Sequence, residues 1–191
     1  MTKFDILGGI QDMKKYFFLV LVVIVFFCFC SSLISAQGTD TTEIPEGFVF
    51  YHYQYAYFDI SLIYPENWIN YSSQERGIFI YTPDSKGILT FLATPFFGKE
   101  YTLAELYSEN MENLKLAGAV FLESVPDKLA GYPAQRTLYM MKFGKDTLKF
   151  VRYDSIIGDL FYSFSFNVHE IDFEKYMNDI LKIVPSIKIN K

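Results

Sequence analysis

The sequence predicts an α+β protein in which an antiparallel β-sheet is flanked by helices, preceded by an N-terminal hydrophobic helix. Three observations predict this class. Strand-like segments with alternating apolar and polar residues dominate after residue 47. Two amphipathic segments with helical spacing interrupt and then close this series of strands. Short turns join the strands between the two helices, which favours antiparallel neighbours over parallel β-α units.

The composition provides ample material for a single core. Of the 191 residues, 51% are hydrophobic, and 20 Phe and 15 Tyr are among them. The formal net charge is −5, without a long run of either sign. A mildly acidic domain is repelled by phosphate backbones, so we expect no nucleic-acid partner.

Residues 1–36 have the features of a signal peptide or an N-terminal membrane anchor. Lys14 and Lys15 precede fourteen residues, Phe17 to Cys30, that carry no polar group except thiols, and small residues follow at 35–36. Counted through Ile34, the apolar segment spans about 27 Å as a helix, close to the thickness of a bilayer core. With or without cleavage, the lysines place the following domain on the outer side of the membrane.

Three further expectations concern the domain boundaries. The compact basic start at Met13 predicts that translation begins there. Both cysteines, Cys28 and Cys30, lie in the leader, so the folded domain can form neither a disulfide nor a thiolate metal site. Residues 37–47 are polar and rich in turn formers, which predicts a linker, and residues 48–191 form the domain.

The first half of the domain is predicted to contain several strands and one helix. The expected strands are 48–57, 58–64, 77–82 and 88–94, with turn residues at 83–87. Thr102 and Glu105 have the spacing of a capping box, which predicts a helix beginning there, and Gly118 can end it. A further short strand is expected at 119–124.

The second half has the pattern of an antiparallel meander closed by a helix. The expected strands are 134–143, 147–157 and 160–168, and the Gly158-Asp159 pair is typical of a tight hairpin. In the last strand, alternation predicts a core face with Tyr162, Phe164, Phe166 and Val168. The closing helix is expected from Asp172 to Val184, ended by Pro185 and followed by a strand at 186–189. Its apolar stripe comprises Phe173, Tyr176, Met177, Ile180, Leu181 and Val184.

Three segments of the domain have the pattern of one known family. The first runs from Phe58 to Trp68, with alternating apolar residues followed by Tyr-Pro, two residues and Trp. The second is Leu129–Ala134, and the third is the closing helix with Ser186–Ile189. They resemble the opening strand, the turn into a central meander and the ending of the PsbP-like domains, which are related to the extrinsic PsbP subunit of photosystem II.

This resemblance covers residues 48–189 and implies a PsbP-like α/β/α sandwich. It implies little about activity, because the fold occurs in photosystem subunits, in a Ran-binding import factor and in bacterial envelope lipoproteins. No ion-binding residue of the family has a matching motif in this sequence.

The sequence offers no catalytic, cofactor-binding or metal-ligating set, and we expect no cofactor. His52 and His169 are the only histidines and lie far apart in the sequence, which favours structural roles. Glu170, Asp172 and Glu174 are expected to complement a helix start, with a calcium site as the alternative.

Two surface features are candidates for function. Tyr51, Tyr53, Tyr55 and Tyr57 share one face of an extended strand and form a candidate interaction surface, because tyrosine combines apolar area with a polar tip. The alternative is an edge strand that covers one side of the sandwich. Asn70 begins an Asn-Tyr-Ser sequon and is a candidate glycosylation site.

From these observations we expect a non-enzymatic binding or accessory module at the outer face of the cytoplasmic membrane. It would act through contacts with an unknown protein or membrane complex. The alternative is a carrier or sensor of a small apolar ligand, held in an aromatic-lined cavity between helix and sheet. An enzyme ranks third.

Overall fold

The computed structural model describes residues 44–55, 58–72, 77–96 and 100–190. The predicted leader (1–36), the start at Met13 and most of the predicted linker lie outside the described residues. Among the helices of the described part, none combines the length and the apolar character needed to cross a bilayer.

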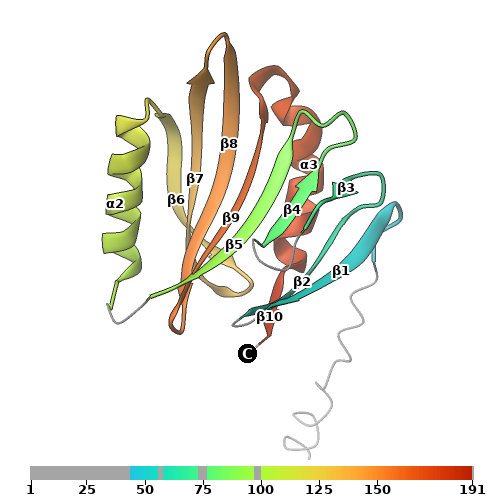
Figure 1. Ribbon diagram of the computed structural model, residues 1–191, viewed down its shortest axis with the longest axis horizontal. Helices are drawn as coiled ribbons and strands as arrows, with labels where there is room; N and C mark the ends of the chain where they lie inside the picture. The colour runs from blue at the N-terminus through green and yellow to red at the C-terminus, as the bar shows by residue number, and fades with distance from the viewer. Residues whose placement is uncertain (1–43, 56–57, 73–76, 97–99, 191) are drawn as a thin grey trace, which may run out of the picture. The chain divides into compact units, whose positions relative to one another are not determined.

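The elements follow one another as strands, helix, strands and helix (Figure 1). The first group is β1 (Phe48–Tyr55), β2 (Phe58–Pro65), β3 (Ile69–Asn70), β4 (Ile78–Tyr81) and β5 (Ile88–Pro95). Helix α2 (Leu103–Leu116) leads to β6 (Val120–Leu129), β7 (Tyr132–Phe143), β8 (Asp146–Ile157) and β9 (Leu160–His169). A 3-10 turn, η1 (Glu170–Asp172), precedes α3 (Phe173–Ser186) and β10 (Lys188–Asn190).

The strands form two antiparallel sheets. The smaller sheet has the order β1-β2-β10, and the larger has the order β3-β4-β5-β9-β8-β7-β6. Every strand pair of the described residues is antiparallel. The predicted α+β class with an antiparallel sheet and two flanking helices is confirmed.

The two helices cover opposite faces of the larger sheet. On one face, the Phe166 ring of β9 lies 6.0 Å from the Tyr176 ring of α3. On the other face, the hydroxyl of Ser124 in β6 bonds to Tyr107 of α2 and accepts a hydrogen bond from Gln135 of β7. The strand register assigns these contacts to different sides, because side chains alternate along each strand.

The core lies between α3 and the sheets and is rich in aromatic rings. Phe166 is fully buried, and its ring stacks on Trp68 at 5.7 Å and approaches Phe173 at 6.4 Å. The alternation predicted for β9 is confirmed, since Tyr162, Phe164, Phe166 and Val168 are all buried.

Polar bonds tie both ends of α3 to the sheets. Near its start, the Tyr176 hydroxyl donates to Asp84 Oδ2 in the β4–β5 turn at 2.9 Å. At its end, Ser186 Oγ donates to the Ile183 carbonyl and accepts the Ile63 amide of β2 at 3.0 Å. These bonds connect α3 to the larger sheet at its start and to the smaller sheet at its end.

Several boundaries differ from the expectation. Strand β6 continues past Ser124 to Leu129, because it pairs with β7 as far as a two-residue turn in which Ala130 and Gly131 both have positive φ. Pro126 is tolerated within β6 because this is an edge strand. The turn between β7 and β8 is also shorter than expected, since Phe143 pairs with Asp146.

Helix α3 does not end at Pro185, as expected, but includes it and ends at Ser186. A proline in the last turn removes one backbone donor, and the Ser186 hydroxyl there satisfies a different helix-end acceptor, the Ile183 carbonyl. The buried stripe also differs by one position. Ile183 is fully buried, whereas Leu181 is 60% exposed.

Candidate functional site

Strand β1 turns its tyrosine face toward the core. Tyr53 is 5% exposed, and its hydroxyl accepts the Gly77 amide at 3.2 Å. Tyr51 and Tyr55 are half-buried and pack against the core, while Tyr57 lies outside the described residues. Burial of the Tyr53 phenol is the main cause that raises its pKa, while the hydrogen bond from Gly77 acts in the opposite direction.

The opposite face of β1 is the one that solvent reaches, and there Phe50 is 58% exposed. Because β1 is one of the two edge strands of the smaller sheet, its placement matches the alternative of an edge strand that covers one side of the core. An interface through the tyrosines themselves stays a prediction.

Each of the two histidines lies close to a different aspartate. His52 Nε2 is 2.7 Å from Asp59 Oδ1, which also accepts the Asn190 side-chain amide, so this group links β1, β2 and β10. His169 Nε2 lies 3.8 Å from Asp146. In the part of the chain that is described, no group of three or more His, Cys, Asp or Glu could hold a metal ion.

The acidic residues at the start of α3 make ion pairs with lysines. Glu174 receives a 3.0 Å hydrogen bond from Lys149, and Asp172 lies 3.7 Å from Lys86. Asp172 makes no side-chain capping bond, so its contribution to the helix start is electrostatic.

Asn70 lies in β3, and its Oδ1 accepts the Ser72 amide at 2.8 Å. Its occupancy by a glycan stays a prediction.

A polar cluster lies on the α2 face of the larger sheet, where β8 passes between β7 and β9. Arg152 Nε donates to Asp154 Oδ1 at 2.8 Å, and Asp154 is fully buried. Burial raises the pKa of the Asp154 carboxyl, although Arg152 acts in the opposite direction. Within the described residues, Asp154 Oδ2 and Thr137 Oγ1 have no direct hydrogen-bond partner.

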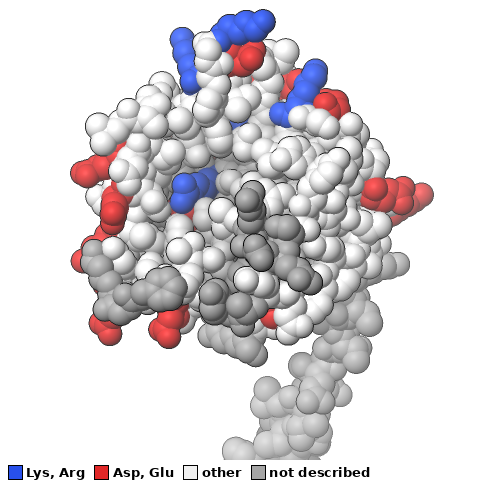
Figure 2. Space-filling view, viewed as in Figure 1, with Lys and Arg blue, Asp and Glu red and all other residues white. Residues whose placement is uncertain are grey.

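Figure 2 shows one side of the molecule in the view of Figure 1, and much of that side is uncharged. Acidic side chains gather where α2 lies in Figure 1, and basic atoms lie in a hollow beside them. On the α2 face of the larger sheet, the strand register makes Arg152 the basic residue that β7, β8 and β9 present.

A groove, here called the α2–β6 groove, runs between α2 and the edge strand β6. It has a volume of about 490 Å³. Its α2 side is formed by Tyr107, Ser108, Met111, Glu112 and Lys115, and its β6 side by residues 121–124. Of the helix, only Met111 is buried, so α2 leaves much of its surface uncovered.

Next to this groove, three aliphatic side chains are exposed within a span of seven residues. Leu116 is 87% exposed, Val120 58% and Leu122 47%. Leu122 lies at the break in register between Phe121 and Glu123, where a β-bulge interrupts the pairing of β6 with β7. We call residues 116–122 the α2–β6 junction.

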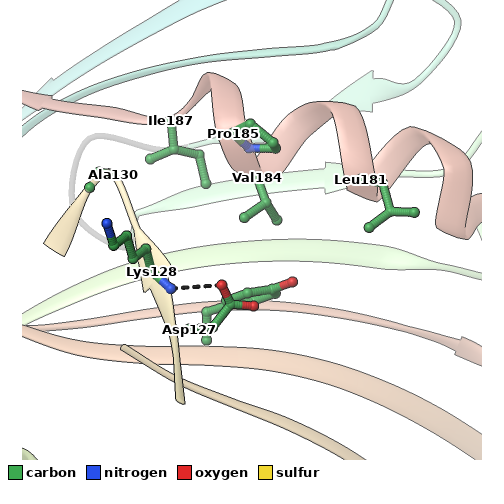
Figure 3. Close-up of a pocket in the computed structure, with 9 residues that line it drawn as sticks. Asp127, Lys128, Ala130, Leu181, Val184, Pro185 and Ile187 are labelled. Carbon is green, nitrogen blue, oxygen red and sulfur yellow. Dashed lines mark hydrogen bonds between the residues drawn. The ribbon is translucent and has the colours of Figure 1, made fainter. Parts of the chain in front are cut away.

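A second hollow, here called the α3 recess, lies between the end of α3 and the β6–β7 hairpin (Figure 3). Its volume is about 380 Å³. The α3 side consists of Leu181, Val184, Pro185 and Ile187, and the other side of Asp127, Lys128, Ala130, Gly131 and Tyr153. In Figure 3, the side chains of Leu181 and Val184 point from the helix toward the hairpin. The recess lies between helix and sheet, but its walls are mainly aliphatic, with Tyr153 as the aromatic residue.

On the hairpin side, Asp127 has two hydrogen-bonding or ionic neighbours. Asp127 Oδ1 accepts the Lys128 amide at 2.8 Å, and its Oδ2 is 3.3 Å from Arg136 Nε. Arg136 also donates to Glu123 at 2.8 Å. Charges of both signs therefore border the recess.

Tyr153 differs from these residues because it is only 4% exposed and yet reaches the recess. Its ring packs edge-on against Phe164 at 5.9 Å. Burial raises the pKa of its phenol, and Asp127 adds to this effect. Its hydroxyl makes no hydrogen bond to any described residue. The hydroxyl is not among the fully buried polar atoms that lack a partner, which fits its position at the recess and makes it available to a molecule there.

From the sequence, a cavity between helix and sheet was expected only as an alternative, with no residues assigned to it, and the α2–β6 groove was not identified. One available signal was Arg152-Tyr153-Asp154-Ser155, because four consecutive polar-tipped residues are unusual inside a strand whose neighbouring residues, Val151 and Ile156, are apolar. The recess also needs the close approach of α3 to a hairpin some fifty residues earlier, which no local pattern encodes.

Comparisons with known proteins support the fold. No protein-family model matches the sequence, and no curated protein matches it. Solved structures do match. The cyanobacterial PsbP (CyanoP) from Synechocystis has a TM-score of 0.57 and 11% identity, over 81% of this chain and 99% of that one. LpqN of Mycobacterium tuberculosis, described as involved in cell envelope biogenesis, has a TM-score of 0.62 and 11% identity, over 75% and 92%.

A third structure, from Bacteroides thetaiotaomicron, has a TM-score of 0.50 and 16% identity, and the match covers 69% of this chain and 45% of that one. At these identities the likeness concerns the fold alone. Together with the antiparallel sandwich and the motifs at 58–68 and 129–134, it leads to one conclusion: the protein has a PsbP-like fold.

Proposed function

We propose that this chain is a non-catalytic, exported binding module that acts at the outer face of the cytoplasmic membrane by contacting a protein partner. The basic and apolar order of residues 14–34 supports export. The fold likeness to LpqN, whose description places it in cell envelope biogenesis, supports a location in the envelope.

The exposed aliphatic cluster at the α2–β6 junction carries the proposal. A side chain such as Leu116, at 87% exposure, contributes nothing to the core of its own domain. Three strongly exposed aliphatic side chains within seven residues of a folded domain are unusual and favour an interaction site. The adjoining groove of about 490 Å³ can receive a side chain of the partner.

The charges around the groove indicate the chemistry of the partner. Helix α2 carries Glu105, Glu109 and Glu112, against Lys115, whereas Glu123 on the β6 side is already paired with Arg136. Figure 2 shows this acidic side of the molecule. A partner segment with apolar side chains flanked by Lys or Arg would complement it.

Site-specific photo-crosslinking in the native host tests this proposal. A photoreactive residue replaces Leu122 in one variant and Phe50 of β1, which has similar exposure, in a matched control. We expect a discrete, reproducible adduct from position 122 and none from position 50. An adduct from position 50 alone would move the interface to β1, and the absence of adducts from both would contradict a protein partner.

Export is tested separately by adding protease to spheroplasts. We expect the domain to be degraded while a cytoplasmic marker protein survives. Protection of the domain until the membrane is disrupted would contradict export.

A second candidate function is a carrier or sensor of a small apolar ligand. The α3 recess favours it, because this hollow has an aliphatic wall and lies between helix and sheet. Native mass spectrometry of gently purified chain would show a bound small molecule as an added mass. A spectrum containing only the bare chain, under conditions that preserve a known carrier complex, would contradict this candidate.

A further inference from the structure

We propose that the α3 recess binds an uncharged aliphatic molecule that carries one hydroxyl or carbonyl group, with the Tyr153 hydroxyl as its hydrogen-bond partner. This inference rests on the second proposed function, the carrier, and does not depend on the protein partner.

The aliphatic wall of the recess favours a ligand with an aliphatic tail. Leu181, Val184 and Ile187 face the recess from the end of α3, and Figure 3 shows Leu181 and Val184 directed into it. Leu181 is 60% exposed, so a bound alkyl chain would remove apolar surface from water. The volume of about 380 Å³ lies within the range of small-molecule sites.

The polar anchor is Tyr153. Its side chain is held by the core, since the residue is 4% exposed and its ring packs against Phe164. A hydroxyl fixed in this way loses little freedom when it forms a bond, and it can donate to a carbonyl or exchange a bond with an alcohol.

The border of the recess disfavours charge of either sign. A carboxylate would meet Asp127 and the negative end of the α3 dipole. An ammonium group would be attracted by Asp127, but this carboxylate already lies 3.3 Å from Arg136 Nε, and Lys128 beside it repels a second cation. Either ion would also lose hydration beside a buried phenol, which costs more than the transfer of a neutral group. The combination selects a neutral head on an aliphatic tail.

The test compares three probes that share one tail: 1-octanol, octanoate and octylammonium, titrated into the full-length chain by calorimetry. We expect 1-octanol to bind at least fivefold more tightly than either ion. Tyr153→Phe removes only the hydroxyl and should weaken 1-octanol binding about fivefold, as expected for one net hydrogen bond. Circular dichroism verifies that this variant folds.

Leu181→Ser tests the tail contact, and the matched control is Ile171→Ser, at an 83% exposed position in η1 that does not line the recess. We expect weaker 1-octanol binding for the first variant and no change for the second. Equal binding of the ions, or 1-octanol binding unaffected by Tyr153→Phe, would overturn the inference and leave the carrier function standing. Failure of all three probes would overturn both.

Discussion

The replacement of Phe166 by Ala tests whether the core between α3 and the larger sheet is packed as described. Phe166 is fully buried, and its ring contacts Trp68, Phe173 and Tyr176, at centroid distances of 5.7, 6.4 and 6.0 Å. Truncation of a buried Phe to Ala typically costs about 3 to 5 kcal/mol. Three aromatic neighbours, each with a contribution of about 0.5 to 1.5 kcal/mol beyond burial, place the expected loss in the upper part of that range.

The assay is urea unfolding, followed by intrinsic fluorescence from the single tryptophan, Trp68. Asn167→Ala is the matched control, because Asn167 is the next residue of β9 and points to the opposite face of the sheet. We expect a change within about 0.5 kcal/mol for the control. A loss below about 1.5 kcal/mol for Phe166→Ala, or equal losses for the two variants, would refute the assignment of the faces.

Three other predictions concern polar contacts. The hydrogen bond from Thr82, with others, lowers the pKa of Asp84 to about 2, so its contribution to stability is complete above about pH 4 and is lost as the pH falls through 2. The stability difference between the wild type and Asp84→Asn, measured by urea unfolding, should therefore shrink between pH 4 and 2, and a constant difference would contradict the shift. Arg152→Met leaves the carboxylate of Asp154 buried without its cation and should cost about 3 kcal/mol, whereas the double variant with Asp154→Leu should recover most of that loss. Thr102→Ala removes one half of the α2 capping box and should cost about 1 kcal/mol in thermal unfolding, against no change for the exposed Ser108→Ala.

Local chemistry was sufficient to predict most of the elements. The Thr102–Glu105 capping box is present, with the Glu105 amide donating to Thr102 Oγ1 at 3.2 Å and the Thr102 amide donating to Glu105 at 2.9 Å. The Gly158-Asp159 hairpin forms between paired Ile157 and Leu160. Such signals depend on residues a few positions apart, so they can be recognised in the sequence without knowledge of the fold.

Features that depend on tertiary contacts could not be predicted in the same way. Helix α3 continues through Pro185 to Ser186, whose hydroxyl bonds to residues of β2 and of the helix itself. Alternation placed Tyr51, Tyr53 and Tyr55 on one face of β1 but could not say that the core, rather than solvent, lies on that side. The α3 recess requires both the full length of β6 and the position of α3. The expected strand, 119–124, was too short to bring Asp127 and Lys128 to the recess.

Hydrogen exchange measured by mass spectrometry tests the central claim, binding through the α2–β6 junction, most directly. Amide exchange would be compared between the purified full-length chain and the complex recovered after crosslinking from position 122. We predict slower exchange in peptides that cover residues 107–124, with unchanged exchange in β1 (Phe48–Tyr55). Slower exchange in β1 with no effect in residues 107–124 would contradict the account.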